Sequence, residues 1–558
     1  MVDTRGSMAE TVPVAGLEHT VLEDSGIPST GREGIVRAAG VNSLGNVASR
    51  ALGLIREAVV SGTFGASGAT SAFDAVSGVP KMVYELLIGG MLSAALVPVL
   101  SEYAADSPET ERDASGQTEL ENVLSILLTL SGLVLVAVVI LLELGAPWIA
   151  PVLVGGFDDQ LLATATQLVR WIVPAILIYG ISGILQAFHY ARKRFVYPAM
   201  GAPVHNIGVI VAVVLLARRL DVASLSIGVL VAACFQLLVQ LGGLRGIRLS
   251  LRFDWRHPVI RRILQLYAPV VLSIVISNLG IIVDRNLASR TVHEAITWMT
   301  KATFLIQLPL GLVSMAISLA VLPTLSQIDA NVELDRFKRT FTQGLRLVIV
   351  VIVPAAVGLF VLGQPIIRLI FEHGEFTSQD TLQTWRALRL YLIGLPFAAI
   401  DLPLVFAFYA QKNTMTPVVV GIVAVVIYLV VGPALAFVAG WGYLGLVAAN
   451  SVQLISHALL MLVFFRKRFR GLAGYGLLET IWKTSVASLL VALPAYGCLR
   501  LLEGIALPAG FLGEAIVVGA CAAVGGLGYL IGARLVRIAE LEQLIAMVRW
   551  RVGRGVAS

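Results

Sequence analysis

Five charged residues lie within stretches of the chain that are otherwise apolar. Arg50, Arg56 and Glu57 fall in the first such stretch, and Asp284 and Arg285 fall together in a later one. A charge inside a bilayer costs several kcal/mol, so it persists mostly where it faces a cavity or a partner. These residues therefore predict a polar path through a membrane protein. Arg50 and Arg56 are predicted to line it, and Glu57, on one helical stripe with Arg50, is predicted to set their electrostatics.

The composition indicates an all-α polytopic membrane protein. The chain has 558 residues, of which 57% are hydrophobic and 14% charged, and its mean hydropathy is +0.86. Soluble domains usually carry about 25% charged residues. Apolar runs long enough to cross a bilayer recur almost to the C-terminus, and they lack the alternation of a β-barrel. No polar block is long enough to hold a large soluble domain.

The apolar runs predict fourteen membrane-spanning helices. They lie near residues 36–62, 72–103, 120–147, 161–190, 196–217, 222–245, 260–289, 294–326, 340–363, 380–410, 415–438, 442–465, 478–502 and 508–533. Residues 1–35 are polar and acidic, which predicts a disordered cytoplasmic leader. Residues 534–558 carry apolar side chains at helical spacing and then arginines, which predicts an amphipathic tail on the cytoplasmic membrane surface.

Lys and Arg concentrate in short connections that follow the fourth, sixth and twelfth predicted spans. These are residues 192–194, 245–262 and 466–470. Such loops face the cytoplasm, so both termini are expected there too. The net charge of +6 therefore reflects membrane orientation and gives no reason to expect nucleic acid as a partner.

An internal repeat predicts two pseudo-symmetric lobes. Tyr-Ala-Arg-Lys at 190–193 matches Tyr-Ala-Gln-Lys at 409–412, and Val-Pro-Val-Leu-Ser at 97–101 matches Leu-Pro-Thr-Leu-Ser at 322–326. The nearly equal offsets indicate parallel repeats, as in transporters whose halves rock against each other. Residues 36–245 and 258–465 are then the two lobes, and the last two spans are an addition.

Further charges within predicted spans are candidates for gating or ion coupling. Asp74, Lys81 and Glu85 share one helical face, where Lys81 and Glu85 could either serve the cavity or neutralise each other. Asp284 and Arg285 are adjacent and point in different directions. We expect Arg285 to face the cavity and Asp284 to bind a cation or a gate partner. For Asp401 both an ion-coupling role and a structural role stay open.

Nothing in the sequence indicates catalysis or a metal site. No P-loop or nucleophile motif is present, and no pair of histidines has ligand spacing. His189, His205 and His457 are predicted to be core or interfacial residues. We expect no cofactor and no enzymatic activity, so transport would draw on an ion gradient, the membrane potential or a substrate gradient.

Several motifs in collinear order resemble those of the MurJ/MviN family of lipid II flippases, in the superfamily of multidrug, oligosaccharidyl-lipid and polysaccharide exporters. The resemblance covers roughly residues 36–470. It is carried by SRALGLIRE at 49–57, Phe64-Gly65-Ala66, Phe73, Val97-Pro98 through Glu102-Tyr103, QLPLG at 307–311, Leu322-Pro323, IIRLIFEHGEFT at 366–377, Phe408-Tyr409-Ala410 and Thr416-Pro417.

The resemblance implies two lobes around a cationic cavity, with a groove for the lipid tail formed by the last two helices, at 478–533. It implies that an undecaprenyl-pyrophosphate-linked disaccharide-pentapeptide moves from the inner to the outer leaflet of a bacterial inner membrane by alternating access. Arginine suits this cargo because it pairs bidentately with phosphate and stays charged. Cell-wall synthesis proteins would be further partners.

The chain also departs from the family pattern. Arg50 and Arg56 match, and Glu57 replaces a usual Asp. Family positions that usually hold Asp, Arg, Glu and Arg are here occupied by Ser71, Tyr84, Gly89 and Phe304. We hypothesise that Lys81 and Lys301, each three residues before a lost arginine, supply the missing cations together with Arg285.

A lipid II flippase is the first functional hypothesis. The alternatives are an exporter of another polyprenyl-linked glycan or of a drug, and a membrane scaffold for cell-wall enzymes that transports nothing.

Overall fold

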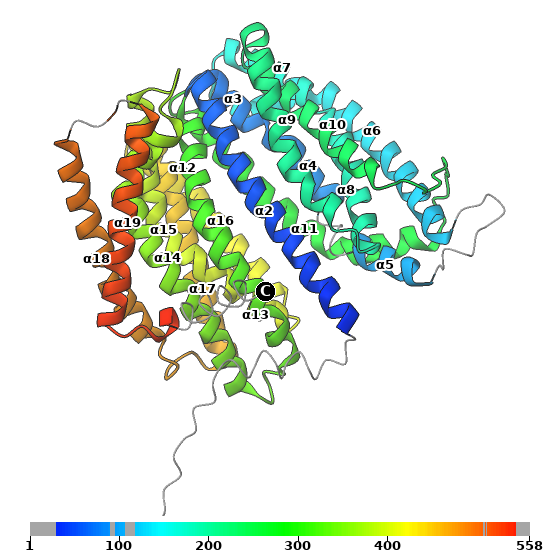
Figure 1. Cartoon of the computed structure of the whole chain (residues 1–558). Coiled ribbons are helices and arrows are strands. Elements are labelled where there is room, and N and C mark those ends of the chain that lie inside the picture. Colours follow the sequence, from blue (N-terminus) through cyan, green and yellow to red (C-terminus); the bar gives the residue numbers. More distant parts are fainter. Residues whose placement is uncertain (1–28, 90–94, 107–117, 506–507, 509, 543–558) are drawn as a thin grey trace, which may run out of the picture.

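The computed structural model describes residues 29–89, 95–106, 118–505, 508 and 510–542, and within these ranges it contains helices and no strand (Figure 1). The first half comprises α2 (Ser29–Phe64), α3 (Gly68–Val76), α4 (Gly78–Tyr84), η1 (Glu85–Gly89), α5 (Val97–Asp106), α6 (Glu119–Val154), α7 (Asp159–Ile172), α8 (Ala175–Ala191), α9 (Val196–Leu220) and α10 (Ala223–Gly242). The second half comprises α11 (Pro258–Ser289), α12 (Ala295–Pro309), η3 (Leu310–Ser314), α13 (Met315–Gln327), α14 (Leu334–Phe371), α15 (Ser378–Ala410), α16 (Met415–Pro433), η4 (Ala434–Val438), α17 (Tyr443–Phe469), α18 (Leu477–Glu503) and α19 (Phe511–Leu535).

The predicted class, an all-α membrane protein, is confirmed. Among the described residues, eleven helices are long and apolar enough to cross a membrane. The other three predicted spans coincide with α2, with the segment from α3 to α5, and with α11, which carry most of the charged residues singled out within predicted spans. One boundary was wrong: α2 begins at Ser29, so residues 29–35 are helical although they were assigned to the disordered leader.

Local side-chain chemistry sets several helix starts. Thr118 and Glu121 form a capping box at the start of α6, in which the Thr118 hydroxyl accepts from the Glu121 N–H at 3.3 Å. Thr377 and Asp380 do the same for α15. These caps satisfy amide groups that the first helical turn leaves without partners.

The repeated sequence motifs adopt the same backbone in the two halves. Lys193 and Lys412, which end the matched tetrapeptides, both have a left-handed backbone, with φ of 56° and 59°. The second and eighth predicted spans both contain a π-helical segment, η1 and η3. A π-helical turn widens the helix and weakens its regular ladder, so these two spans are irregular.

Helices α2 to α10 gather on one side of the molecule and α12 to α19 on the other, with α2 lying along the boundary between them (Figure 1). The terminal pair α18 and α19 packs on α14 at the outer edge. The tail just after α19 is also packed, because Ile538 is 2% exposed beside Val350 and Ala487. Glu540 forms an ion pair with Arg346. The rest of the predicted amphipathic tail, residues 543–558, lies outside the described residues.

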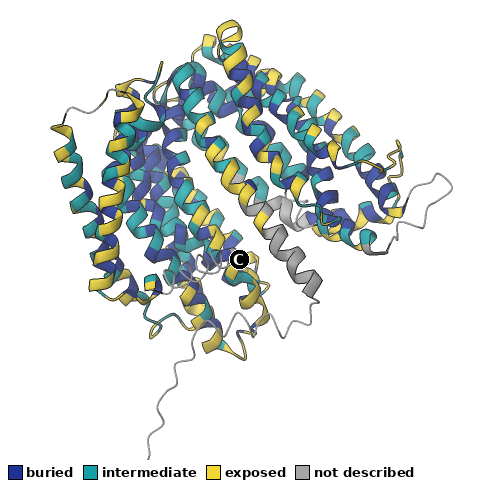
Figure 2. Ribbon diagram, viewed as in Figure 1, coloured by how far each residue is buried: buried dark blue, intermediate teal, exposed yellow. Residues whose placement is uncertain are grey.

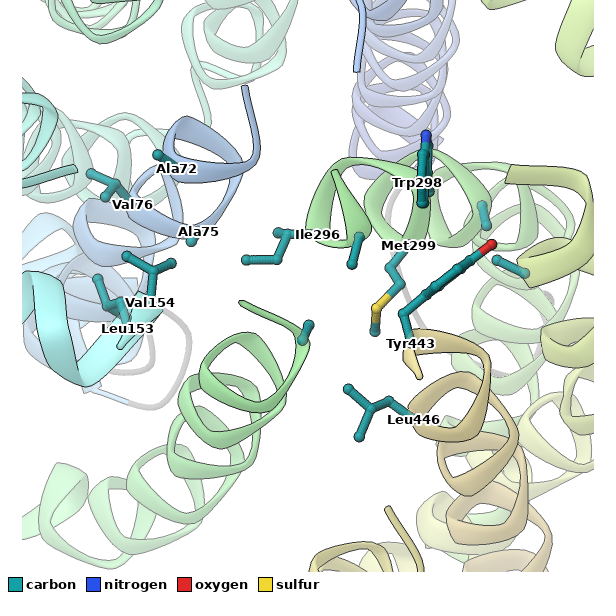
Figure 3. Packing of buried hydrophobic residues seen from close by; sticks show 14 of the residues in the cluster. Ala72, Ala75, Val76, Leu153, Val154, Ile296, Trp298, Met299, Tyr443 and Leu446 are labelled. Carbon is teal, nitrogen blue, oxygen red and sulfur yellow. The ribbon is translucent and has the colours of Figure 1, made fainter. Parts of the chain in front are cut away.

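Apolar packing joins the two sides near one end of the bundle. In the largest core cluster Ile296 of α12 points toward Ala75 of α3, while Met299 and Tyr443 pack behind it (Figure 3). On the outside, large apolar side chains are exposed along α6, α16 and α18, among them Leu141 at 69% (Figure 2). Exposed apolar surface of this extent is expected where lipid is the solvent.

Candidate functional site

A cavity of about 690 Å³ lies between α2, α8, α9, α10 and α12. Arg50 and Arg56, the two arginines predicted from the sequence, both line it. Apart from Phe304 and Leu308, its remaining lining is polar or small: it includes Asn46, Ser49, Gly53, Gln186, Tyr190, His205, Asn206, Gln236 and Gln307. No carboxylate is among the described residues that line it, so the cavity is positively charged.

The Arg50 guanidinium is available to a ligand. Within the described part of the chain it makes no ion pair and no hydrogen bond. It lies against Gly311 in η3, where a Cβ would stand 2.6 Å from one of its terminal nitrogens. Glycine at this position therefore leaves room for the guanidinium between α2 and the irregular turn of the eighth span.

Arg56 belongs to a partly buried polar network that joins α2, α9 and α12. It donates to Glu57 at 2.6 Å and to Asn206 at 3.1 Å. Glu57 in turn accepts from Lys301 at 2.6 Å, and Lys301 is 2% exposed. Glu57 therefore holds one cavity arginine and at the same time ties the first span to the eighth.

Contacts between the two sides continue along α2 beyond Glu57. The Gly62 carbonyl accepts from the Glu375 N–H at 3.0 Å. Gly65, with φ of +60°, packs so closely that a Cβ would lie 2.9 Å from the Glu375 carbonyl carbon. This backbone-to-backbone contact requires glycine, both for its left-handed conformation and for the missing side chain.

Hydroxyl and amide contacts complete this closed seam. The buried Ser71 and Thr297 hydroxyls lie 3.1 Å apart, and the Gly156 N–H donates to Ser289 at 3.0 Å. Asn286 donates to the Pro151 and Val152 carbonyls at the end of α6. The cavity lies along α2 from Gly45 to Arg56. The seam follows from Glu57 to Gly65, just past the end of the helix. The site is thus accessible from one side and sealed on the other.

The lysines proposed to replace lost family arginines lie elsewhere. Lys301 is buried against Glu57, and Lys81 is 77% exposed with Glu85 at 4.0 Å. Neither is among the described residues that line the cavity. Of the two lost arginine positions, Phe304 lines the cavity directly. The Tyr84 ring packs edge-on against that of Tyr179, with centroids 6.3 Å apart.

Asp284 and Arg285 diverge, as their adjacency predicted. The Tyr428 hydroxyl on α16 donates to Asp284, while Arg285 donates to the Thr300 hydroxyl on α12 at 3.0 Å. Arg285 was expected to face the cavity, but the described residues around the cavity do not include it. Asp74, one turn from Ser71, has a buried carboxylate oxygen with no hydrogen-bond partner among the described residues.

Asp401 has a specific partner. Its carboxylate lies 2.8 Å from Nδ1 of His457, which joins α15 to α17. The histidines therefore have roles that their spacing did not reveal. His205 lines the cavity, held by the Tyr179 hydroxyl at 2.6 Å, and His189 is a buried core residue beside Gln240. No group of three or more potential metal ligands occurs in the described ranges.

The glutamine side chains that line the cavity were not predicted from the sequence. Gln236 interrupts the apolar run Cys-Phe-Gln-Leu-Leu of α10, and Gln307 interrupts Leu-Ile-Gln-Leu-Pro of α12. A single polar amide within an apolar span is a usable signal, because it must find a partner or face a polar space.

Comparison with known proteins gives a consistent result. The family model described as "Lipid II flippase MurJ" matches residues 60–517. The lipid II flippase MurJ of Burkholderia cenocepacia is 27% identical over 75% of this chain and 81% of its own length. The probable lipid II flippase MurJ of Thermotoga maritima is 26% identical over 90% and 97%.

Solved structures agree on the fold. One titled as lipid II flippase MurJ in an inward closed conformation superposes with a TM-score of 0.73 at 24% identity, over 88% of this chain and 98% of that one. An inward-facing multidrug resistance MATE family transporter of the MOP superfamily superposes with a TM-score of 0.64 at 12% identity, over 76% and 94%.

Proposed function

Because the chain belongs to the lipid II flippase MurJ family, we propose that it carries lipid II from the cytoplasmic to the outer leaflet of a bacterial inner membrane. The observation that carries this proposal is the Arg50 guanidinium, which has no ion-pair or hydrogen-bond partner among the described residues, beside Arg56 in a cavity whose described lining holds no carboxylate. A pyrophosphate needs such cations to leave water, and a guanidinium can hold it with two parallel hydrogen bonds.

The seam and the cavity together suggest how the carrier works. With both termini cytoplasmic, the cavity half of α2 faces the cytoplasm and the sealed half faces outward. Substrate would enter from the inner leaflet and place its pyrophosphate on Arg50 and Arg56, with its tail along α18 and α19. Opening the outer side requires the Lys301–Glu57 pair and the Gly62–Glu375 contact to separate. Alternating access then follows from rocking the two lobes, residues 36–245 and 258–465.

An ion gradient or the membrane potential would supply the energy. Asp74, Glu85, Asp284 and Asp401 are the proposed gating or ion-coupling groups. Asp284 and Asp401 each bridge two helices through a hydrogen bond, to Tyr428 and His457 respectively, so a change in their charge would alter the packing of the second lobe. Cell-wall synthesis proteins that extend or consume lipid II are the proposed protein partners.

Complementation tests the proposal. A bacterial strain depleted of its own lipid II flippase receives this chain, and lipid II accessible at the outer leaflet is measured. We expect rescue by the unchanged chain, loss of rescue by Arg50→Ala together with Arg56→Ala, and full rescue by Arg218→Ala. Arg218 is a matched control, since it is exposed at the end of α9 and outside the cavity.

The outcomes separate the alternatives. A drug exporter would leave the strain unrescued and change drug accumulation instead. A scaffold would rescue growth even with both cavity arginines replaced, provided that the variant reaches the membrane in equal amount.

A further inference from the structure

We propose that Gln236 and Gln307, with Gln186 beside them, form a second subsite in the cavity that binds the sugars of the lipid-linked substrate, while Arg50 and Arg56 bind its pyrophosphate. The inference rests on the proposed function and adds that two different sets of residues bind the two parts of the substrate. All five residues line the same cavity.

The two principal amides have unused hydrogen-bonding capacity. Within the described part of the chain, no hydrogen bond holds the side chain of Gln236 or that of Gln307. Each lies in an apolar stretch of a membrane-spanning helix, where an amide without a partner is unfavourable unless it faces a polar space. The cavity is that space, and a ligand with matching groups would complete their hydrogen bonds.

The size of the cavity indicates that the ligand extends beyond a pyrophosphate. A volume of about 690 Å³ lies within the roughly 300–1,000 Å³ of sites that enclose drug-sized molecules. Two phosphate groups on the arginines of α2 would leave most of it unfilled. The lining that α8, α10 and α12 contribute includes three neutral amides, beside Tyr190, Phe304 and Leu308.

The chemistry of these amides suits sugar rings. Hydroxyl and acetamido groups carry both donors and acceptors and no charge, and a primary amide offers two donors and one acceptor oxygen. Carboxylates, the other common partners of sugar hydroxyls, would repel the neighbouring pyrophosphate, and none is among the described lining residues. Neutral amides can therefore bind the glycan without weakening the phosphate site.

Equilibrium binding to two probes tests the inference, with the purified full-length chain in lipid nanodiscs. The probes are undecaprenyl pyrophosphate, which has no sugar, and lipid II. We expect Gln236→Leu and Gln307→Leu each to raise the Kd for lipid II about 3- to 10-fold, the range of one or two hydrogen bonds. The Kd for undecaprenyl pyrophosphate should stay unchanged, which also shows that the variants are folded.

Two controls make the result specific. Arg50→Gln should raise the Kd for both probes equally, and Gln327→Leu, at an exposed glutamine outside the cavity lining, should change neither. The sugar subsite is overturned if the cavity glutamine variants bind lipid II normally, or if they weaken both probes alike. Failure of the proposed function would give a different result. The unchanged chain would then bind neither probe, or Arg50→Gln would leave the Kd for both probes unchanged.

Discussion

The Lys301–Glu57 ion pair predicts that replacing Glu57 costs more stability than replacing Lys301. Lys301 is 2% exposed, and Glu57 is its single ion-pair partner within the described residues, whereas Glu57 also holds Arg56 at 2.6 Å. Replacing Glu57 by Leu therefore strands a buried ammonium group. Replacing Lys301 by Met leaves a carboxylate that keeps one cation. The two single variants should therefore lose different amounts of unfolding free energy although they break the same contact.

The magnitudes follow from these partners. An uncompensated buried charge costs about 3–5 kcal/mol, so we expect Glu57→Leu to lower the free energy of unfolding by that amount. Lys301→Met loses one charge-assisted hydrogen bond, which corresponds to about 1.5–3 kcal/mol. The double variant should cost less than the sum of the two, because it removes both charges.

The measurement is reversible unfolding of the purified full-length chain in mixed micelles, followed by circular dichroism. Arg336→Met is the control, because it breaks an exposed pair with Glu333 at 2.8 Å and should change the stability by at most about 1 kcal/mol. Equal losses from the two single variants, or a double variant that costs their full sum, would refute the reasoning.

Three further predictions concern glycine and hydroxyl contacts. Gly311→Ala should displace the Arg50 guanidinium and weaken binding of undecaprenyl pyrophosphate about 3- to 10-fold, with little change in melting temperature. Gly156→Ala should destabilise the chain by about 1–3 kcal/mol in the same unfolding assay, because its Cβ would lie 2.5 Å from the backbone just after α11; unchanged stability would contradict the seam. Ser71→Ala should cost about 1–3 kcal/mol in the same unfolding assay, since it leaves the buried Thr297 groups without their partner; unchanged stability would contradict this contact.

The sequence alone determined the class of fold and the approximate limits of its helices. Hydrophobic run length is a local property, and the predicted spans 415–438 and 442–465 differ by only a few residues from α16 with η4 and from α17. It also identified Arg50 and Arg56, because an arginine in an apolar run needs a polar surrounding wherever the helices pack. The matched tetrapeptides are a local signal too, and the lysines that end them have nearly the same left-handed φ.

Only the tertiary structure decided which charges meet. Lys301 reaches Glu57 across 244 positions of sequence, and Asp401 reaches His457 across 56. Spacing along one helix predicts contacts within that helix, so it suggested the Lys81–Glu85 pair but could not place Lys301 against another helix. The rotation of each helix about its axis decides whether Gln236, Gln307 or Arg285 faces the cavity, and that rotation is set by packing against all neighbours at once.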